Sequence, residues 1–339
     1  MMAAGLRGPL VRRRLRRTTE SSGATEGMSK RADVMVVVPA NNAERFLRET
    51  LDSALRQAGP RAHVVVVDDA STDATLAIAR DMAGASGVGR LTVIARAERG
   101  GPSEARNVGW RLEPASAYVA FLDADDLWDA RKLEVQVDYL ERHPDVVAVG
   151  SFMRYVSSDG RVLGRAGQRV DDADQPRIAR GELVPFPTSS VVVRRAALEA
   201  VDGFDAGFRH GSEDLDLFAR LAQRGRVACV PEVLGSYRIH PASAMARDRR
   251  RINAEARFVR RRLAARAAGG DLTFDEFWQS YRPGWHERRQ DLVEVLYRSA
   301  ALWYGERRPT RAIGYGLLAL LADPTYTLPR LLRQRGEGA

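Results

Sequence analysis

Two carboxylates at the end of one predicted strand have the spacing of a metal site. In YVAFLDADDLWD (118–129), an apolar run leads directly into Asp123 and Asp125. Side chains at i and i+2 of an extended chain share a face, so both carboxylates can converge on one cation. Magnesium and manganese take few protein carboxylates and complete their shell with water and phosphate oxygens. The spacing therefore favours a metal that neutralises a diphosphate leaving group.

The same stretch contains Asp126 and Asp129, for which helix capping is the favoured interpretation. Acids stabilise the N-terminus of a helix because they accept backbone N–H groups and face the positive end of its dipole. We expect these two residues to start a helix that continues to about Leu140. Asp123 and Asp125 lie outside that first turn, so capping explains them poorly.

A second acidic pair, Asp68-Asp69, ends the apolar run HVVVVDD (63–69). Asp69 stands at a strand end, where acids of nucleotide sites accept a hydrogen bond from a base or a ribose. Asp73, four residues later, is typical of a helix N-terminus, and capping is its favoured role.

The third acidic group is Ser212-Glu213-Asp214, for which the sequence leaves two interpretations open. A serine cap followed by two acids in the first turn is what helix stability alone favours. A role for Asp214 as a general base requires desolvation, or the neighbouring Glu213, to oppose the helix dipole, which lowers the pKa of a carboxylate. His240 ends SYRIH, and a lone histidine is more often structural than a ligand.

Composition and missing motifs exclude several classes of protein. The chain has 339 residues, 45% hydrophobic and 29% charged, which is ordinary for one large domain plus an appendage, or for two domains. The sequence lacks HExxH, Cys/His clusters, GxSxG, the Walker loop and GxGxxG. Their absence excludes the common classes of zinc enzymes, of enzymes with a serine nucleophile and of phosphate-loop proteins. Cys229 is the only cysteine, which fits a reducing, cytoplasmic location. The net charge of +9 invites a nucleic-acid function, but most of the excess lies near the chain ends.

The elements that must position these residues alternate between strand and helix. Continuous β-branched runs predict buried strands at 34–39, 63–69, 91–96 and 118–123, and the segments between them predict helices at 45–57, 72–83 and 103–112. This order predicts an α/β domain with a mainly parallel sheet and crossover helices. Ligands of such sheets bind beyond the carboxyl ends of the strands, which is where the polar clusters lie.

Beyond residue 145 the pattern changes. Strand pairs are expected over 146–167 and 227–240, a strand leading into a helix at 188–201, and a helix within 210–225. From about residue 246 the chain is expected to be helical and arginine-rich, and its apolar run at 312–322 is too short to span a bilayer. We predict three parts, which are a basic disordered arm at 1–30, an α/β domain at 31–245 and a helical accessory region at 246–339.

Taken together, these motifs in this order resemble the family-2 glycosyltransferases with a GT-A fold. The similarity covers roughly residues 33–245 and rests on VMVVVPANNAERFLRETLDSALRQ, VVVVDDASTDAT, GGPSEARNVGW, YVAFLDADDLWDARKLEVQ, TSSVVVRRAALEAVDGFD, SEDLDLFARLAQRG and YRIHPAS. It implies a metal-dependent, inverting transfer of a sugar from a nucleotide-diphosphate sugar to an acceptor hydroxyl, in surface polysaccharide, glycolipid or glycoconjugate biosynthesis. Mg²⁺ or Mn²⁺ is the implied cofactor.

The resemblance also implies roles for individual residues. Asp123 and Asp125 match the DxD motif that holds ribose, metal and diphosphate, and Asp214 matches the second acid of an ED motif, the general base. His240 is a candidate additional contact to the metal or the diphosphate. The other implied contacts are Pro39, Ala40, Glu44, Asp69, Arg106, Asn107 and Ala124 on the donor side, and Thr188, Ser189 and Glu213 on the acceptor side.

The implied partners are a UDP-, GDP- or dTDP-linked donor and a saccharide, lipid-linked or other hydroxyl acceptor, with no nucleic acid. The missing QxxRW motif favours single transfer over polymerisation. The role of the C-terminal region stays open. Its arginines and the side chains of Trp278, Trp285 and Trp303 are compatible with a peripheral contact at the cytoplasmic face of a membrane, with a homodimer, or with a solvated surface.

Two other functions are weighed against the glycosyltransferase. A nucleotidyltransferase acting on sugar phosphates should carry a glycine-rich loop with Arg and Lys near the first strand, and PANNAERF (39–46) lacks one. A catalytically silent, basic nucleic-acid-binding or scaffold protein should show salt-dependent binding to nucleic acid.

Overall fold

A computed structural model describes residues 34–87, 89–112, 115–209, 211–243 and 248–336, and for 331–336 only the backbone. These residues belong to one compact unit. The predicted arm at 1–30 lies outside the described residues. The predicted boundary near residue 245 falls in the undescribed segment 244–247, so the division into two parts stays a prediction.

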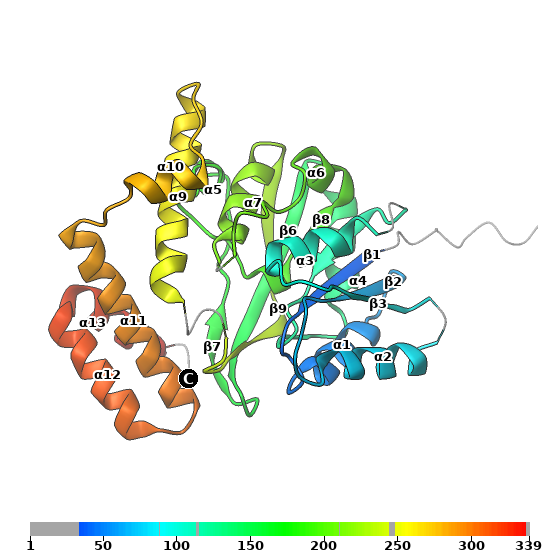
Figure 1. The fold of residues 1–339 in the computed structure, drawn as a ribbon, viewed down its shortest axis with the longest axis horizontal. Helices are drawn as coiled ribbons and strands as arrows, with labels where there is room; N and C mark the ends of the chain where they lie inside the picture. The colour runs from blue at the N-terminus through cyan, green and yellow to red at the C-terminus, as the bar shows by residue number, and fades with distance from the viewer. Residues whose placement is uncertain (1–33, 88, 113–114, 210, 244–247, 337–339) are drawn as a thin grey trace, which may run out of the picture. The chain divides into compact units, whose positions relative to one another are not determined.

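The first half alternates strand and helix as predicted (Figure 1). It consists of β1 (Val34–Ala40), α1 (Leu47–Leu55), β2 (Ala62–Asp68), α2 (Thr75–Ala85), β3 (Leu91–Ala95), α3 (Pro102–Trp110) and β4 (Tyr118–Phe121). β1 lies between β2 and β4 and is parallel to both, with Pro39 beside Val67 and Val37 beside Phe121. The β-branched runs suit these strands because both faces of the sheet are covered.

The next part of the chain extends the sheet with both antiparallel and parallel pairings. It contains β5 (Leu127–Trp128), α4 (Lys132–Arg142), β6 (Val146–Ser157), β7 (Val162–Ala166), α5 (Gln175–Ala179), a 3-10 turn (Thr188–Ser190), β8 (Val192–Arg194), α6 (Arg195–Ala200), α7 (Glu213–Ala222) and β9 (Arg226–Ile239). The strand order is β3-β2-β1-β4-β8-β6-β9-β5, with β7 paired to β6. β8 is antiparallel to both β4 and β6. The predicted α/β class with a mainly parallel central sheet is confirmed.

Two hydrophobic cores, one on each face of the sheet, hold the helices in place. Val36 and Val38 of β1 belong to a core shared with α1, α2 and α4. Met35 and Val37 belong to a second core shared with α3, α6 and α7. Helix α3 can approach the sheet closely because residue 109 is glycine, and a Cβ there would meet Val37 Cγ1 at 2.4 Å.

The predicted strand pair over 227–240 is wrong, because this segment is the single long strand β9. It runs parallel to β6 along most of that strand's length, from Arg226 beside Val146 to Ile239 beside Ser157. A register shift between Ser151 and Phe152 of β6 accommodates residues 231–232. A proline in the middle of the segment therefore bends one strand and does not end it.

Two capping predictions are also wrong. Helix α4 begins at Lys132, and Asp126 instead precedes β5, where its buried Oδ1 accepts the backbone N–H of Arg238. Strand β9 passes beside this stretch and supplies a donor that a sequence pattern does not reveal. Ser212 does precede α7, but its hydroxyl donates to the carbonyl of Ile252 and makes no cap hydrogen bond.

The other capping predictions agree better with the structure. The Asp73 carboxylate accepts the N–H of Thr75 at 2.9 Å, at the start of α2. Asp129 accepts the N–H of Arg131 at 3.0 Å, one residue before α4. Both are local contacts within two residues, which sequence patterns predict best.

The C-terminal region is helical, as predicted. It consists of α9 (Arg249–Ala267), α10 (Phe274–Ser280), α11 (Trp285–Gly305), α12 (Pro309–Ala322) and α13 (Pro324–Gly336). Phe258, Phe277 and neighbouring apolar side chains join α9 and α10 to α7. Arg161, between β6 and β7, donates to the carbonyl of Tyr304 at 2.7 Å at the end of α11. Within the described residues, every helix is too short or too polar to cross a membrane.

Candidate active site

The carboxyl ends of β1, β2 and β4 bring three of the predicted site stretches to one edge of the sheet. The N–H of Asp69, just after β2, donates to the carbonyl of Ala40 at the end of β1 at 2.7 Å. Asp123 follows β4 at the same edge, and its N–H donates to Ser189 Oγ at 3.1 Å. The parallel register of the three strands therefore produces the clustering that the sequence suggested.

Asp69 organises the loop that enters α3. One of its carboxylate oxygens accepts the N–H of Gly100 at 2.9 Å, and the other accepts the N–H of Gly101 at 2.7 Å. Arg96 also forms an ion pair with it. Gly101 has a φ of 92°, which glycine adopts at little cost. The Asp69 carboxylate is thus largely used by the protein itself.

A buried arginine on α3 joins two of the acidic stretches. Arg106 donates to Asp123 Oδ1 at 2.6 Å and to Glu213 Oε1 at 2.7 Å. Its side chain is 4% exposed. Burial alone would lower the pKa of Arg106, but the charges of Asp123 and Glu213 raise it above the usual value, so the guanidinium stays charged. Arg106 therefore fixes the DxD stretch relative to the start of α7.

Asp125 and His240 form a second contact on the cavity wall. Asp125 Oδ2 and His240 Nε2 are 2.8 Å apart, and the His240 ring packs against Phe46 with centroids 4.9 Å apart. Carboxylate oxygens and imidazole nitrogens are both suitable ligands for Mn²⁺. Mg²⁺ prefers carboxylate oxygens. Within the described residues, no three His, Cys, Asp or Glu side chains gather into a complete metal site. The pair therefore fits an ion that takes the rest of its ligands from water and phosphate oxygens.

Arg238 ties this pair to the end of β9. Its N–H donates to Asp126 Oδ1 at 2.8 Å, and its Nε donates to the carbonyl of Asp125, also at 2.8 Å. Burial and the charges of Asp125 and Asp123 hold the pKa of Asp126 well above its ordinary value. The raised pKa favours the uncharged form of the Asp126 carboxyl beside the two acids of the DxD stretch.

Asp214 lies in the first turn of α7, partly buried on the cavity wall. Burial and the charge of Glu213 raise the pKa of Asp214 to about 7, against the opposing effects of the Leu215 N–H and of Arg106. Desolvation and the neighbouring acid therefore outweigh the helix dipole, as a general-base role requires. A carboxylate with this pKa can accept a proton near neutral pH.

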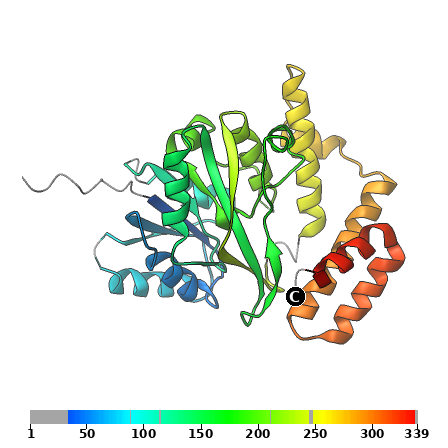
Figure 2. The same ribbon diagram turned by 180° about the vertical axis from the view of Figure 1, so that it is seen from behind.

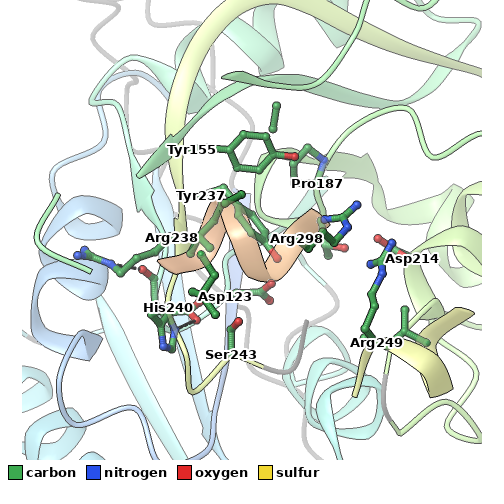
Figure 3. A pocket seen from close by; sticks show the side chains of 18 of the residues that line it. Asp123, Tyr155, Pro187, Asp214, Tyr237, Arg238, His240, Ser243, Arg249 and Arg298 are labelled. Atoms are coloured by element: carbon green, nitrogen blue, oxygen red, sulfur yellow. Dashed lines mark hydrogen bonds and ion pairs between the residues drawn. The ribbon is translucent and has the colours of Figure 1, made fainter. Parts of the chain in front are cut away.

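These groups line one open cavity of about 2300 Å³. The predicted residues on its wall are Pro39, Ala40, Asp69, Arg106, Asp123, Ala124, Asp125, Thr188, Glu213, Asp214 and His240. Figure 3 shows His240 and Arg238 toward one side, Asp214 toward the other, and Asp123 between them in this view. Residues predicted for the donor side and residues predicted for the acceptor side therefore share one cavity.

Three predicted site residues have their side chains engaged elsewhere. The Asn107 amide donates to the carbonyl of Phe204 at 2.6 Å and accepts the N–H of Phe204 at 2.9 Å, so it anchors the 204 loop to α3. Glu44 accepts the N–H of Ala74 at 3.0 Å, at the start of α2. Ser189 is fully buried, and its hydroxyl oxygen accepts the backbone N–H of Asp123.

The cavity also contains residues that the sequence reasoning missed. Tyr155 and Tyr237 lie on its wall with their rings edge to face, and Arg249 and Arg298 reach it from α9 and α11. Both arginines contact the carboxylate of Glu294. Arg238 lies two residues before His240, so the period-2 alternation of an extended chain was a usable signal for it. No sequence pattern places α9 and α11 against this cavity.

We expect Arg106→Ala to destabilise the fold by about 3–5 kcal/mol, because it leaves the buried Glu213 carboxylate and Asp123 without their shared partner. Urea unfolding measures this loss. The matched control is Arg48→Ala, which removes an ion pair with Asp81 whose side chains are 56% and 65% exposed and is expected to change stability by at most about 1 kcal/mol. Equal midpoints for the two variants would contradict a structural role for Arg106.

Comparisons with known proteins define the class of this one. The model of the family "Glycosyl transferase family 2" matches residues 35–201. EpsE of Bacillus subtilis (strain 168), a protein named as a glycosyltransferase, is 31% identical over 58% of this chain and 69% of its own length. Succinoglycan biosynthesis protein ExoO of Rhizobium meliloti (strain 1021) is 28% identical over 88% of this chain and 83% of its own. This chain spans a smaller part of two other relatives. It matches 29% of the length of protein y4gI of Sinorhizobium fredii and 41% of the length of TuaG of Bacillus subtilis.

Solved structures show the same fold. TarS (residues 1–349) of S. aureus, crystallised with UDP-GlcNAc, has a TM-score of 0.53 and 19% identity over 87% of this chain and 91% of that one. The mannosyltransferase PcManGT of Pyrobaculum calidifontis, in complex with GDP-Man and Mn²⁺, has a TM-score of 0.54 and 24% identity over 90% and 80%. The protein is a glycosyltransferase with a GT-A fold. It belongs to glycosyltransferase family 2, and of the three functions weighed from the sequence this is the one confirmed.

Proposed function

We propose that the protein transfers a sugar from a nucleotide-diphosphate sugar to an acceptor hydroxyl with inversion, in the synthesis of a polysaccharide or another glycoconjugate. The observation that carries the proposal is the position of Asp214, a carboxylate with a pKa of about 7, on the same cavity as the DxD residues and His240. Relatives named for polysaccharide synthesis, such as ExoO, support the assignment to a glycan.

The donor belongs at the edge of the sheet formed by β1, β2 and β4. Pro39 and Ala40 line this part of the cavity and would contact the nucleoside, and Gly101, in the loop held by Asp69, lines the cavity as well. Asp125 and His240 would hold a divalent ion, which supplies positive charge to the diphosphate when bound. Asp123 is held by Arg106 with one carboxylate oxygen, which leaves its other oxygen for the ribose or an ion.

The acceptor belongs on the α7 side of the cavity. Asp214 would take the proton of the attacking hydroxyl as the bond to the anomeric carbon forms and the bond to the diphosphate breaks. A diphosphate is a good leaving group, so the reaction needs no second carboxylic acid to protonate it. A single displacement by this route inverts the anomeric centre. Tyr155 and Tyr237 offer ring faces and hydroxyl groups to a sugar acceptor.

A panel of nucleotide sugars tests the proposal. TarS was crystallised with UDP-GlcNAc and PcManGT with GDP-Man, so UDP- and GDP-linked sugars come first, followed by dTDP-linked ones. At least one donor should raise the melting temperature in the presence of Mn²⁺ and not in the presence of a chelator. The same donor should release its nucleoside diphosphate on incubation with the enzyme. If no donor in the panel does either, the proposed function is wrong.

The rate of transfer should rise with pH through about 7. Asp214 accepts a proton only when ionised, and burial beside Glu213 raises its pKa to about 7, so the base is protonated and inactive below this value. Initial rates at saturating donor between pH 5 and pH 9 would show the rise. A rate that is flat across this range, or that falls as pH increases through 7, would contradict the assignment of the base.

A further inference from the structure

Helix α12 presents an apolar stripe to solvent. Ile313, Leu317, Leu318 and Leu321 are 62%, 56%, 53% and 82% exposed. Their spacing places them on one face of the helix, over a length of about 12 Å. Exposed apolar side chains scattered singly over a surface need no explanation, whereas four that adjoin on one helix mark a site of contact.

The opposite face of α12 is apolar as well. It packs along α11, the helix beside it in Figures 1 and 2, and Ala319 on that side is fully buried. From Ala312 to Ala322 the helix has no charged residue. A helix that is apolar on all sides is normally enclosed by protein or lipid. Among the described residues, α12 packs against α11 and α13, and these contacts leave the stripe exposed.

Positive charge surrounds the stripe. Residues 281–336 contain ten arginines and five acidic residues, a net charge of +5. Four of these acids are already paired, Glu287 and Asp291 with Arg257, Glu294 with Arg249 and Asp323 with Arg289. Exposed arginines adjoin the N-terminal end of α12 at positions 307, 308 and 311.

An aromatic side chain lies near the other end of α12. Arg289 donates to the carbonyl of Ala322, the last residue of α12, and also lies over the ring of Trp285. Trp285 is 68% exposed. Indole rings and arginines beside exposed leucines are the composition of helices that lie in a membrane interface.

We propose that α12 docks on the surface of an anionic lipid bilayer through Ile313, Leu317, Leu318 and Leu321. The leucines enter the boundary between headgroups and acyl chains, and the surrounding arginines contact anionic headgroups. Ile313 and Arg330 also line the active-site cavity. Docking through α12 therefore brings the edge of the cavity to the membrane, within reach of an acceptor carried there.

A second copy of the chain fits the stripe less well. An isologous dimer through α12 would bring two arginine-rich surfaces together, and like charges oppose such an approach. Four side chains on one helix also provide much less than the ~800 Å² that each partner commonly contributes to a stable interface.

Sedimentation of the full chain with vesicles tests the proposal without any sugar donor, so its outcome is independent of the proposed function. Wild-type protein should sediment with phosphatidylcholine vesicles that contain phosphatidylglycerol, and less so as salt is raised. The double variant Leu317→Glu/Leu321→Glu should lose at least tenfold in the fraction bound. Neither residue lines the cavity, so the variant should retain the wild-type melting temperature and nucleotide binding. The control Leu112→Glu changes a 45% exposed leucine after α3 and should bind as wild type does.

Three outcomes would overturn the proposal. The first is a wild-type protein that does not sediment with anionic vesicles. The second is a double variant that melts as wild type does and still binds them. The third is a wild-type dimer in velocity sedimentation without lipid that the double variant abolishes, since the stripe would then be a contact between copies of the chain.

Discussion

Asp214→Asn is expected to reduce sugar transfer by about 10²–10⁴-fold and to leave donor affinity nearly unchanged. The amide is similar in size to the carboxyl group but cannot take the proton of the acceptor hydroxyl. Its oxygen can still accept the N–H of Leu215, as Asp214 does at 2.7 Å, so the start of α7 should be preserved. Initial rates of product formation and calorimetric titration with a nucleoside diphosphate separate the two effects.

The matched control for this experiment is Asp202→Asn. Asp202 pairs only with Arg111 among the ion pairs of the described residues, and its side chain is 92% exposed. It should transfer sugar at the wild-type rate. If Asp214→Asn also retains turnover, the base lies elsewhere on the cavity wall. If it loses nucleotide binding together with turnover, Asp214 contributes to the donor site and its assignment to the acceptor side is wrong.

Asp125→Ala is expected to abolish the metal dependence of donor binding. Asp125 and His240 form the pair that fits a divalent ion, and the substitution removes the carboxylate of this pair. Affinity for a nucleoside diphosphate in the presence of Mn²⁺ should fall at least tenfold, which corresponds to about 1.4 kcal/mol. Calorimetric titration with and without Mn²⁺ measures the change, and removal of the metal from wild-type protein with a chelator should reproduce it.

Asp129→Ala is the control in the same acidic stretch. Asp129 is exposed, and its carboxylate accepts the N–H of Arg131 just before α4. Its removal should leave nucleotide affinity and metal dependence as in wild type. An unchanged affinity in Asp125→Ala would refute the assignment of this residue to the metal.

The sequence predicted the parallel half of the sheet well because the signals there are local. The runs VMVVVP and HVVVVDD are short, β-branched and followed at once by polar residues, so both the strands and the edge where they end could be identified. The acids Asp69, Asp123, Asp125 and Asp214 were found in the same way, each at the end of a strand or the start of a helix. Asp73 and Asp129 cap nearby N–H groups, as short-range patterns indicate.

Contacts between distant segments could not be predicted. Asp126 was expected to cap a helix, but β9 brings the N–H of Arg238 to it from 112 positions away in the sequence. Asn107 was expected to contact the donor, but its amide donates to the backbone carbonyl of Phe204. The pKa of Asp214 depends on burial and on Glu213, and the sequence showed only the second of these. Arg249 and Arg298 reach the cavity through the packing of α9 and α11, which carry no motif.

The anomeric configuration of the first product tests the central claim most directly. The enzyme is incubated with a donor from the panel and Mn²⁺, and water serves as the acceptor. Proton NMR spectroscopy can then identify the anomer of the released sugar before the two anomers equilibrate. A single displacement assisted by Asp214 predicts a first product whose anomeric configuration is opposite to that of the donor. A first product that retains the donor's configuration would contradict this mechanism.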